Sequence, residues 1–273
     1  MIELNKFYIG ESVNFMKENI PNNFVDLTVT SPPYDNLRKY NGFIFDYKSI
    51  INELYRVTKD GGTVVWVVGD ATLNGNESGS SFKQALYFKE IGFNLHDTMI
   101  YAKNAVGACG SKYSYQQSFE YMFVFTKGKI KTFNPIKDLI PKNAGKKTTY
   151  AKTKSNDKGY LLETCEKIAP KSSKRQNIWW YDIGFGSGCD KTKHPAVFPE
   201  QLAQDHILSW SNENDIIFDP MCGSGTTCKM AYLNNRNFIG IDMSEEYIEN
   251  ICKPRLIEYG WQENVEIPTS YFS

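Results

Sequence analysis

The sequence of 273 residues predicts an α/β fold, in which an inserted lobe interrupts a mostly parallel central sheet. Two observations support this. Short apolar runs of strand length alternate with helical patterns, which is typical of βαβ units. The segment 128–190 breaks this alternation, because it is rich in Lys, Thr, Ser, Asn and Gly and shows little periodicity. We therefore expect an irregular lobe between two parts of one sheet domain.

The predicted strands are short runs rich in β-branched and aromatic residues, as expected for strands that are covered on both faces. They lie at 6–10, 25–31, 62–70, 96–103 and 121–127. Helical patterns occupy 11–20 and 46–58 between them. In the second helix, apolar residues recur at helical spacing, and Gly61-Gly62 is expected to end it.

A further helix is predicted after the lobe. Residues 194–211 begin with prolines and continue as a helix, with Pro199 near its first turn. One face of this helix carries Leu202, His206, Ile207 and Trp210. A histidine on an apolar helix face is more often a packing residue than a ligand, so His206 is assigned to the core.

Composition indicates which classes of protein are expected and which are not. Hydrophobic residues make up 41% of the chain, enough for a sizeable core. The sequence contains no run of about 18 apolar residues, so no membrane span is predicted. The N-terminus lacks the basic and apolar regions of a signal peptide, so the cytosol is the expected location. The six cysteines form no C-x-x-C pair and the three histidines are scattered, so we predict reduced thiols and no metal site.

The charges are unevenly distributed although their sum is zero. Residues 127–193 carry sixteen Lys and Arg against six Asp and Glu, a balance of +10, which leaves −10 for the rest. A basic segment of this kind is either a solvated, lysine-rich surface or a surface that binds phosphates. The charges alone leave both interpretations open.

A glycine loop lies within a predicted βαβ unit at 215–249. Ile216–Phe218 is the first strand, Gly223-Ser224-Gly225 the loop, and a helix that packs Met230 and Leu233 starts at Thr226. The second strand, 237–242, ends on Asp242. Glycines allow close approach of a ligand, and the start of a helix offers free N–H groups.

The spacing of this unit favours one kind of nucleotide site. Asp242 follows Gly225 by seventeen residues, where an acid can accept hydrogen bonds from ribose hydroxyls. A P-loop is excluded because Thr226-Thr227 follow Gly225 in place of Gly-Lys-Ser/Thr. The dinucleotide pattern G-x-G-x-x-G is excluded because its third glycine is missing.

The two halves of the chain together resemble the amino-group DNA methyltransferases that use S-adenosylmethionine. The segment "FDPMCGSGTT" resembles their cofactor motif, and "TSPPY" resembles their catalytic motif. "KHPAVFPEQL" resembles the segment before the glycine loop that covers the methionine end of the cofactor, and "RQNIWWYDI" the stretch just before it. The order of the motifs is that of the beta class. The resemblance thus implies a circularly permuted, Rossmann-like methyltransferase fold in a bacterial or archaeal cytoplasm.

The resemblance also implies a division of the chain. Residues 1–127 would form the catalytic part and 191–273 the cofactor-binding part of one domain. Residues 128–190 would form an inserted lobe that recognises the target, because the variable lobe does so in this family. The DNA-binding residues expected on this basis are Arg38, Lys146, Lys147, Lys174 and Arg175.

The cofactor site implied by the resemblance consists of the glycine loop and several neighbouring segments. Its expected residues are Glu11, Thr30, Lys193, His194, Pro195, Phe198, Asp219, Pro220, Cys222, Gly223, Ser224, Gly225, Thr226, Thr227, Asp242 and Met243. Glu11 stands where relatives commonly have Asp, and its carboxylate is expected near the adenine amine of the cofactor.

The expected catalytic residues are Ser31, Pro32, Pro33 and Tyr34. An exocyclic amine is a poor nucleophile, because its lone pair is delocalised into the ring. Acceptors aimed at its two N–H bonds favour pyramidalisation, and Ser31 Oγ and the Pro32 carbonyl are suited to this role. The prolines fix the backbone, and the Tyr34 ring can stack on a base flipped out of the duplex.

The target base remains open between two amines. Ser-Pro-Pro-Tyr is associated with N4-cytosine enzymes of the family and Asp-Pro-Pro-Tyr with adenine enzymes. A serine hydroxyl can also donate to N3 of cytosine, which a carboxylate would repel. We therefore predict N4-cytosine methylation of duplex DNA, with N6-adenine as the alternative. A cognate restriction endonuclease and a homodimer are further expectations.

Two other classes of function remain as alternatives. One is a DNA-binding protein with a vestigial cofactor pocket, which the intact motif residues argue against. The other is a methyltransferase acting on RNA or small molecules, and the large basic lobe argues against small molecules.

Overall fold

The computed structural model describes residues 2–33, 45–103, 112–156, 159–181 and 199–263, with the backbone alone at 151–156 and 159–163. The chain divides into two compact units. The sheet unit consists of Met1–Asn134 and Asn177–Ser273, and the hairpin unit of Pro135–Gln176.

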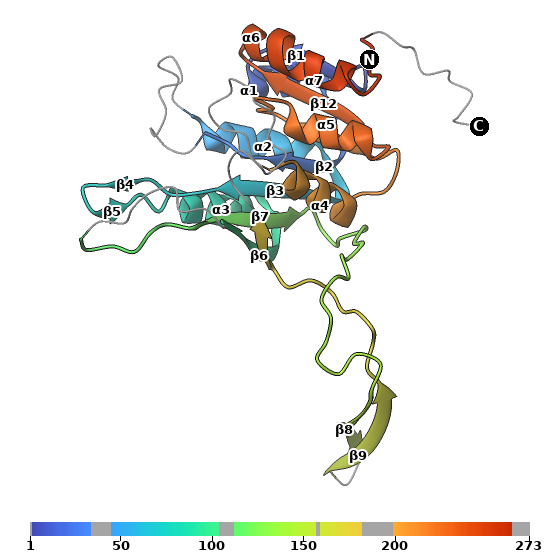
Figure 1. Ribbon diagram of the computed structural model, residues 1–273. Helices are drawn as coiled ribbons and strands as arrows, with labels where there is room; N and C mark the ends of the chain where they lie inside the picture. The colour runs from blue at the N-terminus through green and yellow to red at the C-terminus, as the bar shows by residue number, and fades with distance from the viewer. Residues whose placement is uncertain (1, 34–44, 104–111, 157–158, 182–198, 264–273) are drawn as a thin grey trace. The chain divides into compact units, whose positions relative to one another are not determined.

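An eight-stranded sheet forms the centre of the sheet unit, with the strand order β1-β12-β11-β2-β3-β7-β6-β10 (Figure 1). Its strands are β1 (Lys6–Ile9), β2 (Val25–Thr30), β3 (Thr58–Val68), β6 (Asn94–Lys103), β7 (Phe119–Thr126), β10 (Ile178–Tyr181), β11 (Ile216–Asp219) and β12 (Asn237–Asp242). Five of the seven neighbouring pairs are parallel, and β7 runs antiparallel to β3 and β6. The predicted α/β fold with a mostly parallel sheet is confirmed.

Helices cover both faces of the sheet. The helices are α1 (Ser12–Asn19), α2 (Tyr47–Val57), α3 (Ser80–Ile91), α4 (Glu200–Trp210), α5 (Thr226–Leu233), α6 (Glu245–Tyr247), the π-helical turn η1 (Ile248–Cys252) and α7 (Lys253–Ile257). Helices α1, α2 and α3 share one hydrophobic core with the sheet, in which Leu54, Phe88, Trp66 and Phe218 are fully buried. Helices α4 and α5 pack on each other, and α5 also packs on β11 and β12. A short hairpin of β4 (Thr72–Leu73) and β5 (Asn76–Glu77) precedes α3.

Helix α2 ends at Val57, within one residue of the predicted range 46–58, but the expected role of Gly61-Gly62 as its stop is wrong. Thr58 ends the helix, because its Oγ1 donates to the Leu54 carbonyl, and it also begins β3. Gly61 has φ +82° within β3, next to a register shift against β2. The glycines therefore accommodate a bulge in a strand, which is the other common position for glycine.

The expected irregular lobe is also wrong in its centre. The hairpin unit contains a regular antiparallel pair, β8 (Lys147–Asn156) and β9 (Gly159–Ile168), in register over ten residues each. Neither strand shows the strict apolar–polar alternation that predicts a half-buried strand, so the pattern did not indicate them. Residues 128–134 and 177–181 belong to the sheet unit, where β10 pairs with β6, so the hairpin unit is shorter than the predicted 128–190.

One detail near α4 agrees with expectation and one near α5 differs. Pro199, predicted near the start of the helix, is the N-cap of α4. Leu233, predicted to pack under α5, is 40% exposed, whereas Met230 is buried as predicted. His206 is confirmed as a packing residue: it is fully buried, and its Nδ1 accepts from Trp210 Nε1 at 3.1 Å.

Candidate active site

The predicted catalytic and cofactor motifs meet at the carboxyl ends of neighbouring strands in the sheet. Strands β12, β11 and β2 are adjacent and parallel, so their carboxyl ends lie side by side. These ends carry Asp242, Asp219 and Thr30, and Ser31 follows directly. In open α/β sheets, ligands bind at the carboxyl ends of strands. The sheet order thus brings together two motifs that lie almost 190 residues apart in the chain, Thr30 and Asp219 being in hydrogen-bond contact.

The glycine loop adopts a conformation that other residues would strain. Gly223 and Gly225 have φ of +51° and +74°. A Cβ on Gly225 would lie 3.0 Å from Cys252 Sγ, so the loop packs tightly on the C-terminal helical segment. Helix α5 begins at Thr226, the next residue. A glycine turn that leads into a helix N-terminus is the backbone arrangement that binds nucleotide ligands closely.

Asp242 ties the end of β12 to this loop. Its Oδ2 accepts from the Gly223 N–H at 2.9 Å, and its Oδ1 accepts from the Ser244 N–H at 2.8 Å. A carboxylate has about four lone-pair sites, so two acceptor sites remain for ligand hydroxyls. The conformation of the loop and the position of Asp242 therefore fit the ribose of a nucleoside.

Asp219 links the glycine loop to the catalytic strand. Its Oδ1 accepts from Thr30 Oγ1 at 2.7 Å and from the Met221 N–H at 3.1 Å. The side chain is 2% exposed, and this burial raises the pKa of Asp219 to about 6. A second link joins the same elements, because Thr227 Oγ1 donates to the Val29 carbonyl at 3.0 Å. The described bonds of Asp219, Thr30 and Thr227 are thus to protein groups that join the two motifs.

A third link was missed by sequence reasoning. Ser12 is buried at the start of α1, and its Oγ donates to the Pro220 carbonyl at 2.5 Å. Glu11 caps the same helix, and its two carboxylate oxygens accept from the Val13 and Asn14 N–H groups. The sequence signal for this cap was Glu-Ser before a helical pattern. The structure thus gives Glu11 a capping role beside the cofactor contact predicted for it.

Part of the predicted site lies outside the described residues. Pro32 is buried, and Ser31 and Pro33 are partly buried directly after β2. Met243 and Cys222 lie next to the Asp242–Gly223 contact, and Ser224 and Pro220 are buried in the same loop. The predicted residues beyond the described ranges are Tyr34, Arg38, Lys193, His194, Pro195 and Phe198.

The buried cysteines near the loop are structural thiols. Cys222, Cys228 and Cys252 are free and buried. Burial is the main reason that the pKa values of Cys222 and Cys228 are raised. Thiols held in this way are inert as nucleophiles at neutral pH. Within the described ranges, no three His, Cys, Asp or Glu side chains are arranged to hold a metal ion.

The predicted DNA-binding residues of the hairpin unit have different surroundings. Lys147 Nζ forms an exposed ion pair with Glu166 across the hairpin. Arg175, in contrast, is held by Asp138, which accepts from Arg175 Nε at 2.7 Å and also contacts its second nitrogen. This contact lowers the pKa of Asp138. Arg175 therefore closes the base of the hairpin unit, while Lys146 and Lys147 lie at the start of β8.

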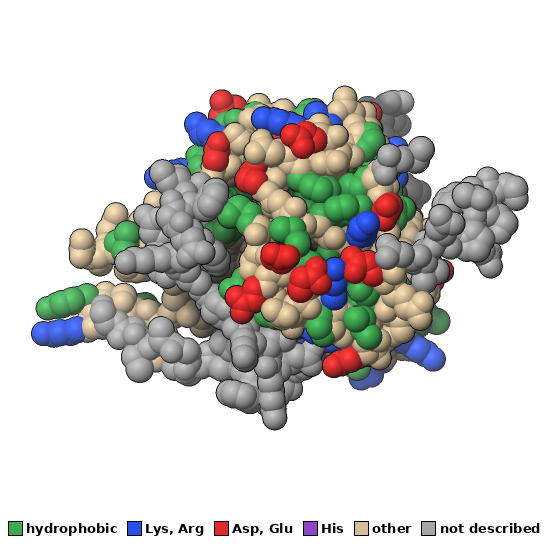
Figure 2. All heavy atoms as spheres, turned by 90° about the horizontal axis from the view of Figure 1, so that it is seen from above, with side chains coloured by type: hydrophobic (Ala, Val, Ile, Leu, Met, Phe, Trp, Pro, Cys, Tyr) green, Lys and Arg blue, Asp and Glu red, His purple; other side chains and the backbone are tan. Residues whose placement is uncertain are grey.

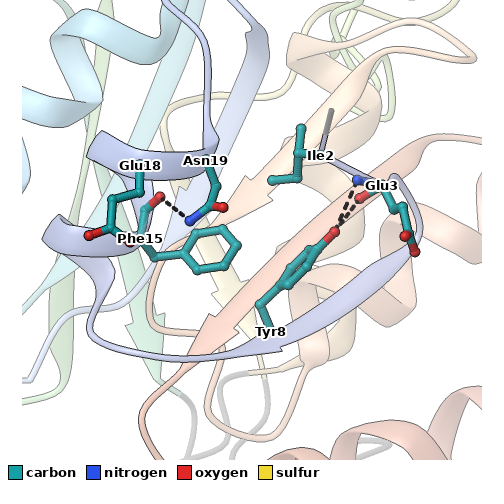
Figure 3. A pocket seen from close by; sticks show the side chains of 6 residues that line it. All are labelled: Ile2, Glu3, Tyr8, Phe15, Glu18 and Asn19. Atoms are coloured by element: carbon teal, nitrogen blue, oxygen red, sulfur yellow. Dashed lines mark hydrogen bonds between the residues drawn. The ribbon is translucent and has the colours of Figure 1, made fainter.

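The described surface has two further features. A shallow hollow between β1 and α1 is lined by Tyr8 and Phe15 with acidic and amide neighbours, none of which was predicted as a site residue (Figure 3). On the face shown in Figure 2, acidic and basic side chains are interspersed, so its described part carries no continuous basic surface. In the described ranges, every helix is too short or too polar to cross a bilayer.

Comparison with known proteins identifies the family of the chain. The model of a family described as DNA methylase, covering N6 and N4 methyltransferases, matches residues 25–253. The chain belongs to this DNA methylase family. The predicted resemblance to amino-group DNA methyltransferases of the beta class is thereby confirmed.

Relatives and solved structures agree with this assignment. The orphan methyltransferase M.BamHII of Bacillus amyloliquefaciens is 54% identical over 248 residues, which cover 89% of this chain and 93% of that protein. The fold matches the PvuII DNA methyltransferase (cytosine-N4-specific) with a TM-score of 0.68 at 18% identity, over 96% of this chain and 88% of that one. It also matches a complex of M1.HpyAVI with SAM, with a TM-score of 0.60 at 23% identity, over 92% and 98% of the two chains. The methylase fold is therefore shared across these proteins.

Proposed function

We propose that this DNA methylase transfers a methyl group from S-adenosylmethionine to N4 of cytosine within a specific duplex sequence. The observation that carries the proposal is the junction of the two motifs, where Thr30 donates to Asp219 at the edge of the sheet. That contact places Ser31 next to the strand end that leads into the glycine loop. A base amine held at Ser31 would therefore lie close to a ligand held by the loop.

The cofactor would be held by the glycine loop and by Asp242. The Gly223–Ser224–Gly225 backbone and the first turn of α5 would face its polar groups, and Asp242 would accept from its ribose hydroxyls. When bound there, S-adenosylmethionine supplies an electrophilic methyl group. Asp219 and Thr227 would keep the loop in register with the end of β2.

The catalytic residues would activate the target amine. Ser31 Oγ and the Pro32 carbonyl would accept hydrogen bonds from its two N–H groups, which localises the lone pair on nitrogen. The prolines keep that carbonyl fixed, because their φ angles are restricted. Tyr34 would stack on the base once the base has left the duplex.

Cytosine is proposed as the target base for two reasons. A serine hydroxyl can accept from N4–H and can also donate to N3 of cytosine, which matches the alternating groups on that base. The PvuII enzyme, whose fold this chain shares, is described as cytosine-N4-specific. DNA contact is assigned to the hairpin unit and its lysines. We further propose that the protein acts beside a separate restriction endonuclease, and as a homodimer in the cytoplasm.

Nucleoside mass spectrometry tests the proposal directly. Duplex DNA treated with the protein and S-adenosylmethionine should yield N4-methylcytosine, and Ser31→Ala should lower the rate by about 10²–10³-fold, the scale for one lost preorganised hydrogen bond. Cofactor affinity of Ser31→Ala should equal that of the wild type. N6-methyladenine as the only product would overturn the choice of base, and methylation of duplex RNA alone would overturn the choice of substrate.

A further inference from the structure

Three charged side chains, two of them buried and one partly buried, form a cluster beneath the glycine loop. Glu200 opens α4, Lys229 lies in α5 and Arg255 in α7. Lys229 Nζ and Arg255 NH2 both contact Glu200 Oε1, at 2.8 Å and 2.6 Å. The two cations are 2% and 5% exposed. Buried charges of this kind are costly unless they are well paired, so the cluster has a defined geometry.

Arg255 also reaches the glycine loop. Its NH1 donates to the Ser224 carbonyl at 2.5 Å and lies 3.3 Å from Thr226 Oγ1. One planar guanidinium thus contacts the loop with one nitrogen and Glu200 with the other. A lysine ammonium is a compact point charge and does not reproduce this fork.

The neighbouring loop carbonyl is held by the same C-terminal segment. Cys252 Sγ donates to the Gly223 carbonyl at 3.1 Å, three residues before Arg255. In a trans peptide the C=O and the following N–H point in opposite directions. Holding the Gly223 carbonyl therefore aims the Ser224 N–H away from Cys252, and holding the Ser224 carbonyl fixes the next peptide plane. The segment Ile248–Ile257 thus determines the orientation of two successive peptides of the loop.

We propose that Arg255 is a positioning residue for the cofactor site. It fixes the glycine loop through the Ser224 carbonyl and connects that loop, through Glu200, to the first turn of α4. Helix α4 directly follows residues 193–198, the other segment predicted to contact the cofactor. This inference rests on the proposed function, because it assumes that S-adenosylmethionine binds at the glycine loop.

Substitution of Arg255 should affect the loop more than the ion pair. In Arg255→Met, the pair between Glu200 and Lys229 remains, so neither of these charges is left unpaired, whereas the Ser224 carbonyl loses its donor. We expect calorimetric Kd values for S-adenosylmethionine and S-adenosylhomocysteine to rise about 10- to 100-fold, the scale of a lost charged hydrogen bond. Arg255→Lys should restore part of this affinity. In turnover, KM for the cofactor should rise more than kcat falls.

Arg236 provides the matched control. It is buried to a similar extent, and its three nitrogens donate to Ser211 and to the Asn234 carbonyl, away from the glycine loop. Arg236→Met should lower the thermal midpoint and leave the cofactor Kd unchanged. Equal cofactor affinity in Arg255→Met and wild type would overturn the inference, as would equal weakening in Arg236→Met.

Two further results keep the test decisive. If Arg255→Met does not fold, Arg255→Lys takes its place, and an unchanged Kd in this variant overturns the inference because the fork is lost. Absence of S-adenosylmethionine binding to the wild-type protein would instead overturn the proposed function. The two failures are therefore distinguishable in one set of titrations.

Discussion

The buried ion-pair cluster of the sheet unit and one exposed ion pair of the hairpin unit differ in what they can do. In the sheet unit, Lys229 and Arg255 are almost fully buried around Glu200. In the hairpin unit, Lys147 and Glu166 pair with side chains that are 68% and 58% exposed. A buried pair holds a fixed geometry, whereas an exposed pair contributes little and exchanges its partners readily. The buried cluster thus fits the positioning role proposed for Arg255, and the exposed pair fits the proposal that Lys147 contacts a phosphate.

The largest expected difference between the units concerns packing. Phe218 lies in β11, the strand between β2 and β12, and its side chain is fully buried. Phe218→Ala should therefore lower the free energy of unfolding by about 3–5 kcal/mol. Ile168 in the hairpin unit is mostly exposed, so Ile168→Ala should change it by less than about 0.5 kcal/mol. Urea unfolding of both variants measures the two values. Similar values would contradict the contrast between the units.

The second prediction concerns pH, and it sharpens the account of buried charge in the sheet unit. Because the pKa of Asp219 is raised from 3.8 to about 6, the native state binds its proton more tightly than the unfolded chain. This group therefore makes stability fall as the pH rises from about 4 to about 6, by roughly 3 kcal/mol. Burial lowers the pKa of His206 to about 3, so this group makes stability rise with pH over the same range.

Asp219→Asn should reveal the contribution of His206. Asp219 Oδ1 accepts from Thr30 and from Met221, and an asparagine oxygen can replace this acceptor, while Thr227 also hydrogen-bonds the Asp219 side chain. The variant should then gain stability more steeply than the wild type between pH 4 and 6, by roughly 3 kcal/mol over the range. Urea unfolding at several pH values measures the slope, and a profile parallel to the wild type would show that Asp219 titrates normally.

The third prediction concerns the cofactor side of the sheet. Asp242→Ala should weaken S-adenosylmethionine binding by about 1–3 kcal/mol, the scale of a lost charged hydrogen bond. Asp215→Ala is the control, because Asp215 lies at the opposite end of β11 and accepts from the Asn212 N–H at 2.7 Å. Calorimetry on both folded variants measures the effect. Unchanged affinity in Asp242→Ala would remove Asp242 from the site.

The smallest effect on stability is expected in the hairpin unit. Lys147→Gln should change the free energy of unfolding by less than about 1 kcal/mol, because its pair with Glu166 is exposed. It should nevertheless reduce the slope of log K for DNA against log salt by about one, if this lysine contacts a phosphate. Joint neutralisation of Lys146 and Lys147 should reduce the slope further and leave cofactor affinity intact.

Lys6 in the sheet unit is the control for this titration. It forms a surface pair with Glu3, so Lys6→Gln removes one charge of similar kind outside the hairpin unit. The salt slope of Lys6→Gln should equal that of the wild type. Equal slopes in the wild type, Lys147→Gln and Lys6→Gln would place the DNA surface away from β8.

Patterns that are local in the chain were predictable. The glycine loop, the strand that ends at Asp242 and the helix that buries Leu54 are each specified by neighbouring residues, through backbone freedom and apolar spacing. The hairpin β8–β9 was not predictable from its pattern, because this segment shows little apolar periodicity. Gly61-Gly62 were misjudged as the stop of α2, because glycines fit a bulge in a strand as well as a helix end.

The family, the order of the motifs and the chemistry that each motif offers follow from short stretches of the chain. How these motifs are held together depends on the folded structure. The contacts of Asp219 with Thr30, and of Arg255 with Ser224 and Glu200, join residues that are far apart in the chain. No local pattern specifies such partners, because they depend on which strands become neighbours and which charges are buried between them. The site is therefore encoded in two short motifs, but its geometry is set by the sheet order and by the buried cluster beneath the loop.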